Sequence, residues 1–324
     1  MQILVTGCAG FIGYHLCLKL LQDKKNYVYG IDVMDPYYDL KLKINRIKDI
    51  KKKYKKFIFY KKDIGNLKFL KNNFKKNKYD YVINLAAQAG VRYSLIDRNK
   101  YLKNNIIGFF NILESCKELK IKHLIFASTS SVYGNNKKFP YRETDNTDKP
   151  LSFYAATKKS NEVMAYSYSN LYKIPCTGLR FFTVYGPYGR PDMSLFKFTQ
   201  AILKSKKIEL YNKGKHFRDF TYIDDVVEGI SKLLTKPPIK KIPYSIYNLG
   251  NGKPTSLKLF VKIIENSIGK KTKIALKPFQ TGDVYKTHAN INSLKRLINF
   301  NPKTNVNVGI KKFIYWYKKY KKIK

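Results

Sequence analysis

The feature that most constrains this chain is a glycine-spaced turn that joins an apolar segment to an amphipathic helix. Residues 2–7, QILVTG, are typical of a buried strand, and Gly7, Gly10 and Gly13 follow before apolar residues recur at helical spacing up to Leu21. Glycines at this spacing allow a tight turn, a close backbone approach to a pyrophosphate and close packing of a helix whose N-terminus favours anions. An ordinary glycine-rich strand–helix turn would look the same, so the turn alone leaves both interpretations open.

The alternation of strand and helix continues through the first half of the chain. We expect further strands at 27–32, 57–60, 80–87, 122–128 and 176–182, and helices at about 38–53, 66–74, 101–119 and 152–172. Repeated β-α-β units with apolar strands are typical of a parallel sheet covered by helices on both faces. The sequence therefore predicts an α/β fold with a doubly wound parallel sheet of the Rossmann type.

The pattern loosens after Gly186, where prolines and glycines mark loops. Beyond them we expect a helix near 195–205, a strand, turn and helix over 219–234, a strand at 245–250, and short helices within 254–268 and 290–300. We predict a Rossmann domain of residues 1–183 and about 219–250. A smaller α/β substrate-binding domain would comprise residues 184–218 and 251–324.

The charge of the chain is strongly positive, with 64 Lys and Arg against 22 Asp and Glu and a formal net charge of +42. The lysines are spread in short runs along the chain, and neither a zinc-finger spacing nor an aromatic RNA-binding signature accompanies them. We interpret this as a compositional bias at solvent-facing positions and expect no specific nucleic-acid partner. Nonspecific binding to polyanions at low salt is the alternative.

The sequence carries no obvious membrane or metal signal. No apolar stretch approaches the roughly 20 residues that cross a bilayer, and the N-terminal residues enter a strand without a basic leader. We expect a cytoplasmic protein without a membrane partner. The four cysteines lie far apart without metal-ligand spacing, so we expect free buried thiols and no metal, and we expect none of the four histidines to be catalytic.

Two aspartates follow the second and third expected strands. Asp32 lies 19 residues after Gly13, where a carboxylate accepts hydrogen bonds from an adenosine ribose and repels a 2′-phosphate, which favours NAD over NADP. A strand-terminal aspartate that only caps the next turn is the alternative. We also assign to the cofactor site Asp63 and a set of apolar residues: Phe11, Ile12, Ile64, Leu85, Ala86 and Ala87.

A tyrosine and a lysine are spaced to share one face of a helix. Tyr154 and Lys158 lie four residues apart in FYAATKKS, and a nearby ammonium favours the phenolate of a tyrosine, whose ordinary pKa is ~10. Such a pair can serve as a general base near neutral pH. In a lysine-rich helix the spacing also arises by chance. Thr129, 25 residues earlier, ends an expected parallel strand, where the ligands of such sheets bind.

Together these elements resemble the extended short-chain dehydrogenase/reductase superfamily over essentially the whole chain. Five segments, at 85–94, 126–134, 153–162, 179–193 and 217–225, are similar to those of nucleotide-sugar epimerases, and in particular of UDP-glucuronate 4-epimerases. The resemblance implies that Tyr154 takes the proton of the sugar 4-hydroxyl while hydride passes from C4 to NAD. The 4-keto sugar then rotates and hydride returns to its other face.

The resemblance also implies roles for single residues and an assembly. Thr129 would hydrogen-bond the same sugar oxygen, and Lys158 would bind the nicotinamide ribose and lower the pKa of Tyr154. We expect a homodimer, because helices 101–119 and 153–172 carry apolar side chains on more than one face.

The hydroxyl cluster in 126-FASTSSVYG-134 contains no carboxylate. Related dehydratases and sugar-acid decarboxylases carry an acid there, whereas an epimerase that acts on a sugar acid forms a β-keto acid that would lose CO₂ readily. Thr129, Ser130, Ser131 and Thr183 could hold the sugar carboxylate by hydrogen bonds without adding a second negative charge. The absence of an acid therefore favours an epimerase for a uronate.

Cationic side chains complete the expected substrate site. Arg190 could bind the carboxylate in bidentate fashion, or it could pair with Asp192 or cap a turn, and Arg92 is a second candidate. From the resemblance we assign Arg218 to the diphosphate, Phe196 and Lys197 to the uracil, and Asp283 to a ribose. The segment 277–283 departs from relatives that carry a second arginine there.

Several alternatives stay open at this stage. The substrate could be UDP-glucuronate, its 2-acetamido analogue or a neutral UDP-hexose, and a UDP-glucuronate decarboxylase has the same fold. A noncatalytic dinucleotide sensor or polyanion-binding protein is favoured only by the charge of +42.

Overall fold

A seven-stranded parallel sheet forms the centre of the computed structural model, which describes residues 1–280 and 282–323. In spatial order the strands are β10 (Tyr244–Leu249), β6 (Cys176–Phe181), β5 (His123–Thr129), β4 (Tyr81–Asn84), β1 (Gln2–Thr6), β2 (Tyr27–Asp32) and β3 (Phe57–Lys61). The predicted doubly wound parallel sheet is confirmed. The chain changes direction across the sheet between β1 and β4, and a ligand-binding crevice lies at such a point.

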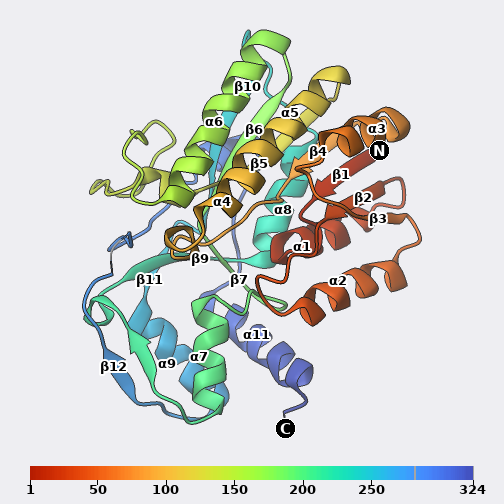
Figure 1. Ribbon diagram of the computed structural model, residues 1–324. Helices are drawn as coiled ribbons and strands as arrows, with labels where there is room; N and C mark the ends of the chain where they lie inside the picture. Colours follow the sequence, from red (N-terminus) through yellow and green to blue (C-terminus); the bar gives the residue numbers. More distant parts are fainter. Residues whose placement is uncertain (281, 324) are drawn as a thin grey trace.

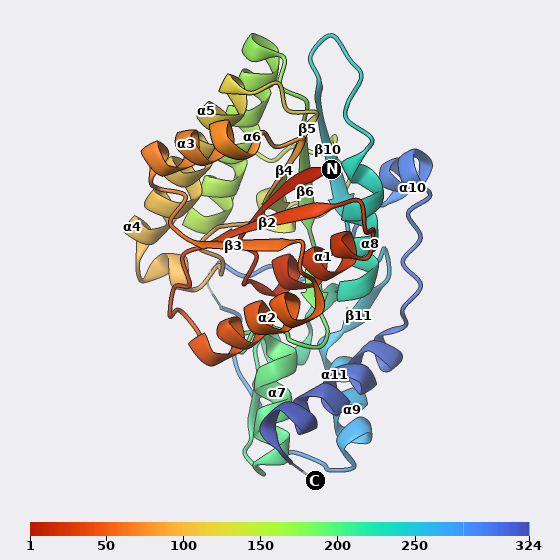
Figure 2. The same ribbon diagram turned by 90° about the vertical axis from the view of Figure 1, so that its right-hand side faces the viewer.

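Helices cover both faces of this sheet (Figures 1 and 2). One face carries α3 (Leu67–Asn77), α4 (Arg98–Tyr101), α5 (Gly108–Glu118) and α6 (Phe153–Tyr172), and the other carries α1 (Phe11–Leu21), α2 (Leu40–Lys53), α8 (Ile223–Leu234) and α10 (Asn292–Ile298). The single helix expected at 101–119 is divided, because the π-helical stretch η2 (Leu102–Ile107) joins α4 to α5.

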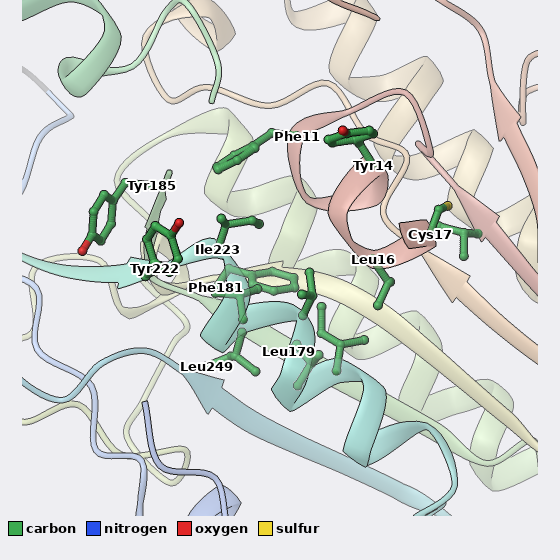
Figure 3. Close-up of a cluster of buried hydrophobic side chains, with 14 of the residues drawn as sticks. Phe11, Tyr14, Leu16, Cys17, Leu179, Phe181, Tyr185, Tyr222, Ile223 and Leu249 are labelled. Atoms are coloured by element: carbon green, nitrogen blue, oxygen red, sulfur yellow. The ribbon is translucent and has the colours of Figure 1, made fainter. Parts of the chain in front are cut away.

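The largest apolar core fills the space between the sheet, α1 and α8 (Figure 3). Leu16 of α1, Leu179 of β6 and Ile223 of α8 are fully buried in it. Burying a side chain of this size contributes roughly 1.5–3 kcal/mol, so this layer fixes α1 and its glycine turn against the sheet. All four cysteines are buried and free, as predicted.

The smaller part of the molecule lies below the sheet in Figure 1 and consists of short strands and three helices. Strands β7 (Thr183–Tyr185), β9 (Phe217–Tyr222) and β11 (Pro254–Ser256) form one small sheet, and β8 (Ile208–Leu210) pairs with β12 (Ile274–Leu276). Helices α7 (Ser194–Leu203), α9 (Leu257–Ile268) and α11 (Val306–Lys321) pack beside them. No described helix is long and apolar enough to span a bilayer. The boundaries of the two predicted domains stay a prediction.

Helix α11 was not among the helices expected from the sequence, where its lysines are more conspicuous than its apolar residues. Ile310, Phe313, Ile314 and Tyr317 are buried at helical spacing, and the lysines of the last turn occupy other positions. An apolar stripe of this kind stabilises a helix by packing, even when lysines occupy many of its other positions.

Candidate functional site

A cavity of roughly 470 Å³ opens at the carboxyl ends of the parallel strands. It is bordered by the turns after β1, β2, β3 and β4, by the ends of β5 and β6, and by the first turns of α6. The predicted site residues that line it are Gly7, Gly10, Phe11, Ile12, Gly13, Asp32, Asp63, Ile64, Leu85, Ala86, Ala87, Thr129, Ser130, Ser131, Tyr154, Lys158, Thr183, Arg190, Arg218 and Asp283. The fold thus brings together side chains from six strand ends.

The glycine turn forms a cradle that larger residues could not form. Gly7 has a φ of +70°, and a Cβ on it would lie 2.7 Å from the backbone nitrogen of Ala86. A Cβ on Gly13 would lie 2.2 Å from the carbonyl oxygen of Gly7. The N-cap of α1 is Gly10, so no capping side chain takes up the first N–H groups of the helix. This end of the cavity therefore fits a pyrophosphate group.

Asp32 lies at the end of β2 and is almost fully buried. It caps the turn that follows the strand, which was the alternative to a role in cofactor binding. Its two oxygens accept hydrogen bonds from the backbone nitrogens of Ala9, at 3.0 Å, and Met34, at 2.8 Å. Burial raises the pKa of its carboxyl group, and nearby Lys43 opposes this shift. Each oxygen retains a lone pair, so the carboxylate can also accept from ribose hydroxyls. Asp63 accepts from Gly65 N at 2.7 Å.

Tyr154 and Lys158 project from the first turns of α6 toward the end of β5. Burial raises the pKa of Tyr154, while a hydrogen bond with Thr129 and the positive charge of Arg190 lower it. Lys158 is 2% exposed, and its ammonium donates to Ala127 O at 2.9 Å. Burial lowers the pKa of Lys158 to about 8. In this geometry Thr129 and Arg190 favour the phenolate, whereas Lys158 was expected to do so.

A buried ion pair behind the cavity was not anticipated from the sequence. Glu162, one turn beyond Lys158 on α6, accepts two hydrogen bonds from Arg180 of β6, both at 2.9 Å. Glu162 also accepts from Ser128 Oγ at 2.6 Å, and Arg180 donates to Tyr133 OH at 3.1 Å. The pair thus joins α6 to the segment that carries the hydroxyl cluster.

Two of the cationic side chains expected to bind the substrate, Arg190 and Arg218, are paired with aspartates. Arg190 donates from Nε and Nη2 to the carboxylate of Asp192, at 3.0 and 2.5 Å, and Arg218 donates to Asp283 Oδ1 at 2.6 Å. Tyr37 OH donates to Asp192 Oδ2 at 3.3 Å. Arg190 therefore forms the pairing that was the alternative to substrate binding, while it also lines the cavity.

Three predicted substrate residues lie outside the described cavity lining. Arg92 is exposed, with its guanidinium 5.0 Å from the centre of the Tyr211 ring. Phe196 is buried against Phe313 and Tyr317 of α11, and Lys197, next to it on α7, is exposed.

Several lining residues were missed, although most of them follow strand ends of the parallel sheet, where ligands of this fold class bind. They include Asp35, Tyr37, Tyr38 and Lys43 after β2, Gln88 and Gly90 after β4, and Val284 and Thr287 near Asp283. Within the described ranges, no group of three or more His, Cys, Asp or Glu side chains is arranged to hold a metal ion.

Comparison with known proteins gives concordant matches. Residues 3–250 match the model of the NAD dependent epimerase/dehydratase family. The chain is 49% identical to Protein CapI of Staphylococcus aureus, over 99% of this chain and 100% of that protein. It is 42% identical to a probable UDP-glucuronate 4-epimerase of Rhizobium meliloti, over 98% and 97%. The crystal structure of UDP-glucuronic acid 4-epimerase from Bacillus cereus, in complex with UDP-glucuronic acid and NAD, superposes with a TM-score of 0.93 at 34% identity, covering 99% of this chain and 100% of that chain.

Proposed function

Because the chain belongs to the NAD-dependent epimerase/dehydratase family, we propose that it interconverts UDP-glucuronate and UDP-galacturonate by epimerisation at C4. The observation that carries this proposal is the composition of the site. Tyr154 and Thr129 line the cavity together with the hydroxyl groups of Ser130, Ser131 and Thr183, and residues 128–131 contain no acid. Arg190 borders the same cavity. The similarity to UDP-glucuronate 4-epimerases supports the same substrate.

The cavity fits NAD. The cradle of Gly7, Gly10 and Gly13 would receive the pyrophosphate, and Asp32 would accept from the adenosine ribose and disfavour a 2′-phosphate. When bound, the nicotinamide accepts hydride from C4 of the sugar and returns it. The residues of the chain orient both partners and move the proton.

Tyr154 is proposed as the base that takes the proton of the 4-hydroxyl. Its hydrogen bond with Thr129 and the charge of Arg190 stabilise the phenolate against burial. Lys158 would turn its donors to the nicotinamide ribose, because its ammonium on α6 already lies beside Ala127 of β5 at the cavity. The same groups reverse the proton transfer when the rotated keto sugar is reduced.

The proposal for a uronate rests on how the site would hold the carboxylate. Thr129, Ser130, Ser131 and Thr183 offer neutral donors, and Arg190 offers a charged one. A dehydratase or decarboxylase is less well supported, because positions 128–131 contain only Ser and Thr. For the nucleotide we propose Arg218 and Asp283, while Arg92, Phe196 and Lys197 would need to move or act indirectly.

We further propose a homodimer. Five large apolar side chains are exposed: Val163, Tyr166 and Leu171 on α6, Phe110 on α5, and Ile107 at the end of η2. Two neighbouring helices with such faces could form a four-helix contact with a second copy. Light scattering at micromolar concentration should give twice the chain mass, and the monomer mass would contradict this assembly.

Epimerisation by the purified protein is the direct test. We expect conversion of UDP-glucuronate, resolved from UDP-galacturonate by chromatography, with little conversion of UDP-glucose and no pentose product. Tyr154→Phe should retain NAD and lose activity by at least ~10²-fold, since a positioned base contributes ~10²–10⁴-fold. Conversion of only neutral sugars would refute the choice of substrate. We also propose that the protein acts in the cytoplasm and supplies activated uronates for polysaccharide synthesis.

A further inference from the structure

A fully buried arginine on α2 joins three segments that surround the cavity. Arg46 is 0% exposed and is not part of the described cavity lining. Its Nη1 donates to Ala9 O at 2.7 Å and to Tyr38 OH at 2.8 Å, and its Nη2 donates to Tyr188 O at 2.5 Å. All three acceptors are neutral oxygens. A buried charge is costly unless hydrogen bonds satisfy it, so these three contacts hold Arg46 and its acceptors in one arrangement.

The first contact reaches the turn that is assigned to the cofactor. Ala9 lies between Gly7 and Gly10, and both polar atoms of its backbone are held. Ala9 N donates to Asp32 Oδ2 at 3.0 Å, and Ala9 O accepts from Arg46. Arg46 is therefore anchored to the most rigidly built part of the cavity wall.

The second contact reaches the loop that carries Arg190. Tyr188, two residues before it, has a φ of +56°, a left-handed conformation that is strained in a residue other than glycine. Its carbonyl accepts from Arg46, and the preceding carbonyl, Pro187 O, accepts from His15 Nε2 at 2.9 Å. Burial lowers the pKa of His15 to about 4, so the ring is neutral at pH 7. Side chains of α1 and α2 thus hold two consecutive carbonyls of this loop.

The ring of Tyr188 is held as firmly as its backbone. Its centroid lies 4.8 Å from that of Tyr14 on α1 and 4.9 Å from that of Trp316 on α11. Strained backbone persists only where the surrounding structure imposes it, and such strain is concentrated at functional sites. The direction in which the chain leaves Tyr188 determines where Arg190 begins.

The third contact supports the neighbours of the Arg190 side chain. Tyr38 is next to Tyr37, whose ring centroid lies 5.9 Å from the guanidinium carbon of Arg190. Tyr37 OH also donates to Asp192 Oδ2 at 3.3 Å. Arg46 therefore fixes both the loop that bears Arg190 and the segment against which its guanidinium lies. A bidentate contact with a carboxylate depends on the alignment of two planar groups, so this framing matters for binding.

We propose that Arg46 is a positioning residue for the uronate: it holds the Arg190 loop and the Tyr38 segment against the cofactor turn, and so aligns Arg190 with the sugar carboxylate. This inference rests on the proposed function and adds to it a residue that touches neither ligand. A guanidinium is suited to the task, because its two terminal nitrogens reach Ala9 O and Tyr188 O at the same time. A lysine keeps the charge, but its single nitrogen lacks this fork.

Calorimetry with two sugars separates a positioning role from a purely structural one. In a Tyr154→Phe background at saturating NAD, Arg46→Met should weaken the binding of UDP-glucuronate about three- to tenfold more than that of UDP-glucose. The binding of UDP alone should not change. In an Arg190→Ala background the same substitution should leave the ratio of the two sugar affinities unchanged, because its effect passes through Arg190. Lys48→Met, which removes an exposed lysine from the same helix, is the control for the change of charge.

The contrary results are distinct from one another. Equal weakening of both sugars by Arg46→Met would show a purely structural role and overturn the inference. An undiminished effect of Arg46→Met on the ratio in the Arg190→Ala background would also overturn it. If Arg190→Ala alone leaves the ratio unchanged, the proposed uronate contact fails and the positioning role fails with it. If Arg190→Ala changes the ratio and Arg46→Met does not, only the positioning role fails. Arg46→Lys, with the same expected results, replaces Arg46→Met if that variant does not fold.

Discussion

Lys158 should make the protein less stable than it would be with an apolar residue at the same place. Burial lowers the pKa of this lysine from 10.5 to about 8, and each pH unit of such a displacement corresponds to about 1.4 kcal/mol. The buried charge therefore costs roughly 3 kcal/mol at pH 7. The hydrogen bond from Lys158 to Ala127 O offsets about 1 kcal/mol of this cost. We expect Lys158→Met to raise the free energy of unfolding by about 2 kcal/mol at pH 7 while abolishing activity.

The stability difference between the wild type and Lys158→Met should depend on pH. Below pH 8 both the folded and the unfolded state carry the Lys158 proton, so the wild type bears the full penalty. Between about pH 8 and pH 10.5 only the unfolded state retains the proton, and the stability of the wild type rises with pH. The methionine variant lacks this group, so its advantage should be largest at pH 7 and should largely disappear by pH 10.

Guanidinium unfolding of NAD-free protein at equal chain concentrations measures this difference at each pH. Lys159→Met, which removes a less buried lysine from the next position of α6, is the matched control. A Lys158→Met variant that is less stable than the wild type at pH 7 would refute the reasoning. So would a stability difference that stays constant from pH 7 to pH 10.

Three further predictions concern the other parts of the site. Glu162→Gln leaves the buried guanidinium of Arg180 without a charged partner and should lower the free energy of unfolding by about 3–5 kcal/mol, and a loss below 1 kcal/mol by guanidinium titration would contradict the buried pair. Gly13→Ala places a Cβ 2.2 Å from a carbonyl oxygen, so the protein should purify with much less NAD, and full occupancy by absorbance would count against the cradle. Arg190→Ala should weaken the binding of UDP-glucuronate at least tenfold by calorimetry, and the binding of UDP-glucose much less. Equal losses of affinity for the two sugars would assign the arginine to the fold. The double variant with Asp192→Ala shows how much of the loss comes from leaving Asp192 unpaired.

The architecture could be predicted largely from periodicity. Apolar strands of a parallel sheet are buried on both faces, so their sequences stand out, and the strands of the sheet were found within a few residues. The division of helix 101–119 by η2 could not be predicted, because a π-helical turn preserves the apolar pattern on either side. Helix α11 was missed because its lysines outweigh the stripe of Ile310, Phe313, Ile314 and Tyr317.

The site could be predicted where a residue acts through its position at a strand end. Asp32 and Thr129 are of this kind, since the carboxyl ends of parallel strands share one edge. Residues whose role depends on a contact with a residue distant in the sequence could not be predicted from the sequence. Glu162 and Arg180 are 18 residues apart and meet only because α6 packs on β6. Phe196 was assigned to the uracil, but it lies in the core, because α7 packs so that the Phe196 ring contacts Tyr317 of α11.

The arrangement of charges around the cavity bears on why the base is a tyrosine. Arg190 is paired with Asp192, Arg218 with Asp283 and, behind the hydroxyl cluster, Arg180 with Glu162. Lys158 instead donates to a neutral carbonyl, so its charge is not cancelled by a carboxylate. A proton leaving Tyr154 creates a negative charge in a region of low dielectric constant, where the hydroxyl of Thr129 and the positive charge of Arg190 stabilise it. A carboxylate base there would carry its charge before the reaction and repel a uronate, whereas a phenol is neutral while the substrate binds and becomes charged only when the sugar is oxidised.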